Sequence, residues 1–99
     1  MTISIQFVKI QTSEALHNYI TKKLIKLGKK YPRVIKANVF IKLDTIPSGK
    51  GKICEMELSV PGPRIFAVSR EKNFEMAVKE TISDLEKQLK KLKASVTAH

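Results

Sequence analysis

Apolar and polar residues alternate in four segments of the chain, as they do in half-buried β-strands. These segments are residues 3–7, 36–44, 54–60 and 64–69. Alternation gives one face of each strand to the core, so in the last segment we expect Ile65 and Ala67 to point inward. The other face of the third segment carries Glu55 and Glu57, and we expect that face to meet solvent.

Two further segments place apolar residues at the spacing of an amphipathic helix. The first follows Ser13, a residue type that caps helices, and is expected to end between Gly28 and Pro32. Its apolar stripe consists of Leu16, Ile20, Leu24 and Leu27. The second follows Asn73, another capping residue, and is expected to end at about Lys93. Its stripe consists of Phe74, Val78, Ile82, Leu85, Leu89 and Leu92.

The order of these elements, β-α-β-β-β-α, predicts an α+β fold. We expect a four-stranded sheet whose last three strands are antiparallel in series, with two helices packed on one face. This arrangement is like that of double-stranded-RNA-binding domains. We expect residues 1–99 to form a single domain, with residues 94–99 as a frayed tail.

The positive charge of the chain is concentrated in its helices. The 99 residues carry a net charge of +10, which favours nucleic acid, anionic lipid or acidic protein as a partner. In the first helix, three lysines fall in one band beside the apolar stripe: Lys22, Lys26 and Lys29. Two more lie at the edge of that stripe: Lys23 and Lys30. No acidic side chain between Glu14 and Asp44 offsets their repulsion, so the band favours an anionic partner over a purely solvated face.

The back half of the second helix is also basic, and two interpretations of it stay open. Four lysines follow its last acidic residue, Glu86: Lys87, Lys90, Lys91 and Lys93. Bases near a helix C-terminus complement the macrodipole, and lysines placed for that purpose need no partner. Alternatively, these lysines continue the anion-binding surface of the first helix.

Nucleic acid fits this surface better than a membrane does. A membrane-surface helix needs large apolar groups that are free to insert, but both stripes are needed to cover the sheet and the chain has no Trp. RNA readers that use a sheet face need exposed aromatic side chains, and Phe40 and Phe66 are the only candidates on the outer face. We therefore expect the helices to contact RNA phosphates and shape, with few bases read.

The sequence gives little support to catalysis or to a bound cofactor. His17 and His99 are far apart, and Cys54 alternates with core positions, so we predict no enzyme activity, no metal site and no cofactor. The segment PSGKGK at 47–52 lacks the spacing of a phosphate-binding loop. The start of the chain, MTISIQF, lacks the pattern of a secretory signal, and we expect a cytoplasmic protein.

Both helical segments resemble those of one protein family. The segment TSEALHNYITKKLIKLGKKYP is similar to a T-E-A-L…K-L-x-K first helix, and KNFEMAVKETISDLEKQLKKLK to a D-x-Y-x-A-I…L-x-x-Q-L-x-K-x-K second helix. These helices and their spacing resemble the ribosome hibernation promoting factors, also called ribosome-associated inhibitors and formerly sigma-factor modulation proteins. The D-x-Y start of the second helix reads Asn73, Phe74 and Glu75 here, without the tyrosine.

The resemblance implies an inhibitor of translation in stressed or stationary cells. Such a protein binds small-subunit rRNA in the channel used by mRNA and tRNA, and competes with both. The rRNA-facing positions of the family map to Lys22, Lys23, Lys26, Lys29, Lys30, Lys87, Lys90, Lys91 and Lys93. We expect the chain to be a monomer when free. Because it ends at His99, it resembles the short forms of the family, which lack a ribosome-pairing domain.

Two alternatives to this function stay open. The basic helices are also suited to docking an acidic protein, such as a transcription factor. A generic double-stranded RNA binder is the other alternative, but those domains usually run α-β-β-β-α. The leading strand and helix of this chain argue against a plain copy of that arrangement.

Overall fold

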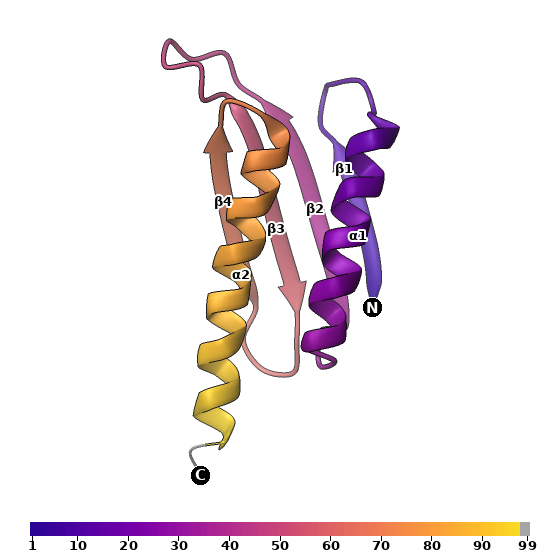
Figure 1. Ribbon diagram of the computed structural model, residues 1–99, viewed down its shortest axis with the longest axis vertical. Coiled ribbons are helices and arrows are strands. Elements are labelled where there is room, and N and C mark those ends of the chain that lie inside the picture. The colour runs from indigo at the N-terminus through magenta and orange to yellow at the C-terminus, as the bar shows by residue number, and fades with distance from the viewer. Residues whose placement is uncertain (98–99) are drawn as a thin grey trace.

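Six elements follow one another in the order that the sequence predicts. The structure, a computed structural model, describes residues 1–97 (Figure 1). The elements are β1 (Thr2–Phe7), α1 (Glu14–Lys30), β2 (Lys36–Leu43), β3 (Lys52–Ser59), β4 (Ile65–Glu71) and α2 (Phe74–Thr97). Local chemistry starts both helices where expected. The Leu16 backbone N–H donates to Ser13 Oγ at 3.2 Å, and the Met76 N–H donates to Asn73 Oδ1 at 2.8 Å.

The four strands form one sheet in the order β1-β2-β3-β4. Strands β2, β3 and β4 are antiparallel neighbours, as predicted, whereas β1 pairs with β2 in parallel. A parallel pair needs a crossover connection, and α1 supplies it. A row of apolar side chains crosses all four strands on the inner face: Ile5, Val39, Met56 and Ala67.

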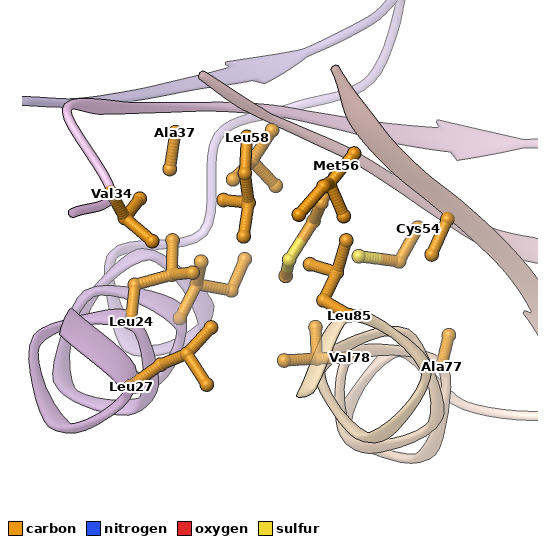
Figure 2. Close-up of a cluster of buried hydrophobic side chains, with 14 of the residues drawn as sticks. Leu24, Leu27, Val34, Ala37, Cys54, Met56, Leu58, Ala77, Val78 and Leu85 are labelled. Atoms are coloured by element: carbon orange, nitrogen blue, oxygen red, sulfur yellow. The ribbon is translucent and has the colours of Figure 1, made fainter. Parts of the chain in front are cut away.

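Both helices cover this inner face, side by side and running in the same direction (Figure 1). Their apolar stripes and the inner face of the sheet form one continuous core, drawn in Figure 2. Ile65 and Ala67 point into that core, as the alternation predicts. Thr81 is its one buried polar residue among those described, and its hydroxyl lies within hydrogen-bond distance of the carbonyl oxygens of Ala77 and Cys54. The core therefore fixes which side of each helix remains for solvent.

The second helix is longer than expected. It continues through Thr97, four residues beyond the predicted end at Lys93, because residues 94–97 contain neither glycine nor proline to stop it. The expected tail at 94–99 is therefore wrong for residues 94–97, which are helical. Residues 98–99 lie outside the described part of the chain.

Leu85 offers a test of how α2 is held on the sheet. This side chain is fully buried, so Leu85→Ala should lower the free energy of unfolding by about 2–5 kcal/mol, through lost apolar burial and a cavity. Denaturant-induced unfolding followed by circular dichroism measures the change. Ile25→Ala is the matched control, since Ile25 is 47% exposed on α1 and its truncation should change stability little. Equal losses in the two variants would contradict this account of the core.

Candidate nucleic-acid interface

Three lysines form an exposed band along α1. The stripe of α1 that contains Ile20 and Leu24 is buried against the sheet. The helical period of 100° per residue then places the three lysines within an arc of about 60° on the opposite side. They are Lys22, Lys26 and Lys29, all of them exposed. We call them the α1 band. Its members project away from the core.

The other two lysines of α1, Lys23 and Lys30, make side-chain contacts within the chain. The Lys23 Nζ lies 5.6 Å from the centroid of the Tyr19 ring. The Lys30 Nζ lies 3.2 Å from the Glu86 Oε2 of α2, and the Tyr31 hydroxyl donates to the same oxygen at 3.4 Å. The Lys30 side chain is 58% exposed, so this ion pair contributes at most about 1 kcal/mol and leaves Lys30 able to meet a phosphate. The sequence placed Lys30 in the RNA-binding set without revealing its partner.

The second half of α2 carries exposed lysines, and its C-terminal end lies beyond the end of α1 (Figure 1). Glu86, at the start of this half, contacts Lys30 in the last turn of α1. We call the exposed lysines of this half the α2 band: Lys87, Lys90, Lys91 and Lys93. Because the two helices run in the same direction, both bands lie toward the same end of the molecule.

The macrodipole does not account for the α2 band. The favourable effect of a cation on a helix C-terminus is confined to about the last turn. In α1 that turn holds Lys29 and Lys30, but in α2 it holds no basic residue, because the helix continues through Thr97. The lysines from Lys87 to Lys91 therefore lie in the helix interior. This finding favours the second interpretation, in which both bands form one anion-binding surface.

The outer face of the sheet has no comparable excess of charge. Its acidic side chains are paired with cations: Lys42 Nζ of β2 lies 2.7 Å from Glu55 Oε2, and Arg64 Nη1 of the β3–β4 connection lies 3.6 Å from Glu57 Oε2. Phe66 is 50% exposed beside them. A single exposed phenylalanine among paired carboxylates is a poor platform for RNA, so the helical face remains the candidate interface.

The structure also gives information on metal binding, on membrane spanning and on the reactivity of Cys54. Among residues 1–97, no three His, Cys, Asp or Glu side chains lie close enough together to hold a metal ion. In the same part of the chain, neither helix combines the length and the apolar character that spanning a membrane requires. Cys54 is fully buried, and desolvation by burial raises the pKa of its thiol to about 12. The thiol is therefore protonated and packed in the core, away from any nucleophile's role.

Comparison with protein families shows to which family the chain belongs. Residues 3–97 match the family described as Sigma 54 modulation protein / S30EA ribosomal protein. The chain belongs to this family. The match includes both helices and all but the first residue of the sheet, so the family resemblance seen in the two helical segments is confirmed.

Solved structures share the S30EA fold. A ribosomal subunit interface protein from Coxiella burnetii is 26% identical, with a TM-score of 0.83, and the match covers 95% of this chain and 99% of that one. The N-terminal domain of Thermus thermophilus Protein Y is 22% identical, with a TM-score of 0.77 and coverage of 93% and 99%, and it shows the fold alone. No curated protein matches the chain. The predicted α+β class and element order are those of the family.

The buried thiol predicts a low reactivity toward alkylating agents. At about pH 8, the difference between a pKa of about 12 in the folded chain and 9.0 in an unfolded one lowers the thiolate fraction roughly a thousandfold. Iodoacetamide should therefore modify the native chain far more slowly than the urea-unfolded chain, measured by mass spectrometry, with Cys54→Ala as the unlabelled control. Equal rates would contradict a buried thiol.

The same pKa fixes the sign of a pH effect on stability. The Cys54 thiol of the folded chain holds its proton more tightly than the thiol of the unfolded chain, so the protonated thiol stabilises the fold. This contribution to the free energy of unfolding is fully present below pH 9.0 and is lost as the pH rises from 9.0 to about 12. Over that window the free energy of unfolding of the native sequence should fall more steeply than that of Cys54→Ala.

Proposed function

We propose that the chain binds the small ribosomal subunit and inhibits translation. The observation that carries the proposal is the interior position of the α2 band, which the helix dipole does not explain and which extends the α1 band. Membership of the S30EA family and similarity to a ribosomal subunit interface protein support the ribosome as the partner. No catalytic step and no cofactor enter this function.

In the proposed complex the helical face contacts rRNA. The two helices, of 17 and 24 residues, are about 25 Å and 36 Å long, which is enough to meet several phosphates at once. Lysine is a mobile point charge and suits phosphates better than base edges. Binding would release counterions from the RNA, which favours association without reading much sequence. The outer face, with Glu55 and Glu57, would point away from the RNA.

The chain would inhibit translation by occupying the channel of the small subunit that mRNA and tRNA use. The channel of the small subunit that holds mRNA and the anticodon arms of tRNA is lined by rRNA phosphates, which the two bands complement in charge. A chain lying there excludes both natural occupants, so it competes with them as a cytoplasmic, monomeric inhibitor. In stressed cells this would keep ribosomes in a hibernating state.

One observation favours a second candidate function. The family description includes modulation of sigma 54, a transcription factor, and the same lysine bands suit an acidic protein surface. Binding to the ribosomal subunit separates the two functions, because a protein-docking module has no need of rRNA.

Removing the α1 band should weaken subunit binding without harming the fold. The variant in which Lys22, Lys26 and Lys29 are changed to Gln should bind purified small subunits at least tenfold more weakly in a sedimentation assay. Its thermal stability should be unchanged or slightly raised, because repulsion between lysines one turn apart is relieved.

The matched control removes the same charge at the other end of the molecule. Lys9, Lys50 and Lys72 are exposed and precede α1, β3 and α2, so their change to Gln leaves both bands intact. This variant should bind the subunit nearly as well as the native chain. Equal weakening in both variants would show that net charge alone governs binding and would contradict a defined surface.

The salt dependence of binding tests the phosphate contacts. With about six lysine–phosphate contacts, log K should fall against log salt with a slope of about −4 to −5. Titrations of labelled subunits at several potassium chloride concentrations give this slope, and the α1 variant, which loses three contacts, should reduce its magnitude by about 2 to 2.5. A slope near zero would favour an apolar protein interface over rRNA.

A further inference from the structure

A pocket of about 240 Å³ lies between the C-terminal end of α1 and the second half of α2, beside Lys93 of the α2 band. Four segments line it: the last residue of α1, the α1–β2 connection, the β3–β4 connection and the second half of α2. Its apolar lining comes from Tyr31, Val60, Leu89 and Leu92. Its cationic lining includes Lys30 and Arg33. The pocket therefore combines an apolar floor with positive charge at its rim.

The length of α2 explains why this hollow exists. Leu89 is 4% exposed and packs at the edge of the core, whereas Leu92, one turn further, is only partly buried. Leu92 lines the pocket together with Val60 and Pro61, which follow the end of β3 at Ser59. The continued helix thus holds apolar side chains beyond the strands, over the chain that connects α1 to β2.

Contacts around Glu86 fix one wall of the pocket. The Glu86 carboxylate accepts the Tyr31 hydroxyl at 3.4 Å and pairs with Lys30 at 3.2 Å. Burial, together with the charge and hydrogen bond of Glu86, raises the pKa of Tyr31, so its hydroxyl stays a donor. The aromatic ring is held in place before any ligand arrives, which favours binding because little side-chain freedom is then lost.

The lining suits one flat, partly apolar group that carries a nearby negative charge. The volume lies below the range of about 300–1,000 Å³ typical of drug-sized ligand sites, so a single ring system fits better than a folded segment. Bases of single-stranded RNA commonly stack on aromatic rings or on arginine planes. The rim cations continue the α1 and α2 bands, so a polynucleotide lying along those bands reaches the pocket with a base and its phosphates together.

We propose that this pocket binds one unstacked nucleobase, with its flanking phosphates on Lys30 and Arg33. In the subunit complex that base would belong to rRNA, and this part rests on the proposed function. The pocket would then give the chain one base contact in an interface otherwise made of phosphate contacts. It would also fix the position of the chain along the RNA, which mobile lysines alone do poorly.

The first experiment uses the whole chain and a small probe. Adenosine 5′-monophosphate is titrated into the ¹⁵N-labelled chain while amide chemical shifts are recorded, with inorganic phosphate and octanoate as parallel probes. The nucleotide should shift the amides of Tyr31, Val60 and Leu92, whereas phosphate should shift only those near Lys30 and Arg33. No shift with the nucleotide, equal shifts with phosphate, or a stronger response to octanoate would each overturn the proposal.

Two variants test the pocket without removing the lysine bands. Leu92→Trp should fill it and abolish the nucleotide shifts, and Met76→Trp is the control, because Met76 is exposed near the other end of the same helix. Arg33→Gln should weaken nucleotide binding severalfold, whereas Arg64→Gln, the same change in the β3–β4 connection outside the lining, should not. The spectra also report whether each variant folds. If Leu92→Trp does not fold, the comparison of Arg33→Gln with Arg64→Gln tests the pocket instead.

Subunit binding separates this inference from the proposed function. Loss of one stacked base should lower the subunit affinity of Leu92→Trp by about 5- to 100-fold relative to Met76→Trp. If Leu92→Trp binds like the native chain while the α1 variant binds weakly, the pocket proposal is wrong and the proposed function stands. If the native chain does not bind subunits but the nucleotide shifts occur, the proposed function fails and the pocket remains a base-binding site.

Discussion

Burial of two apolar stripes on one face of a single sheet is the constraint on which the surface depends. Once Leu24 of α1 and Leu85 of α2 are buried between helix and sheet, the opposite sides of both helices must face solvent together. The crossover between parallel β1 and β2, and the turn after β4, then set both helices running in the same direction (Figure 1). Lysines toward the C-terminal ends of two separate helices are thereby brought toward the same end of the molecule.

This surface holds more like charge than folding alone would favour. Lysines one helical turn apart repel one another, and α1 supplies no acidic residue after Glu14 to offset them. Glu86 offsets part of this charge, because its carboxylate contacts Lys30 and the Tyr31 hydroxyl between the helices. Like charge kept in place despite a small loss of stability is typical of a surface used for binding. A phosphate-rich partner would remove the repulsion and restore that stability in the complex.

Much of the fold could be predicted because its determinants are local. Ser13 and Asn73 bond to backbone N–H groups three residues away, and alternation alone placed Ile65 and Ala67 in the core. The outward direction of the α1 band follows from the helical period in the same way. These features depend on a few neighbouring residues, so one sequence suffices to find them.

Other features depend on contacts between distant segments, and the sequence did not reveal them. Glu86 is 56 residues from Lys30, and no local pattern pairs them. Ile53 lies on the outer face yet is 5% exposed between its cross-strand neighbours Lys42 and Arg70, whose stems can cover it. The pocket depends on the placement of α2 over the connection after α1, which no local pattern reveals. The helix α2 was also predicted too short, because neither glycine nor proline occurs between Lys93 and Thr97.

Competition on the purified small subunit tests the central claim most directly. The claim is that the helical face occupies the channel used by mRNA and tRNA. At fixed salt, the chain should block initiator tRNA from vacant subunits and should be displaced from subunits that already hold mRNA and tRNA, while the α1 variant should do so only at much higher concentration. Simultaneous and undiminished binding of the chain and tRNA to one subunit would contradict the claim, even if the chain proved to be bound to the ribosome.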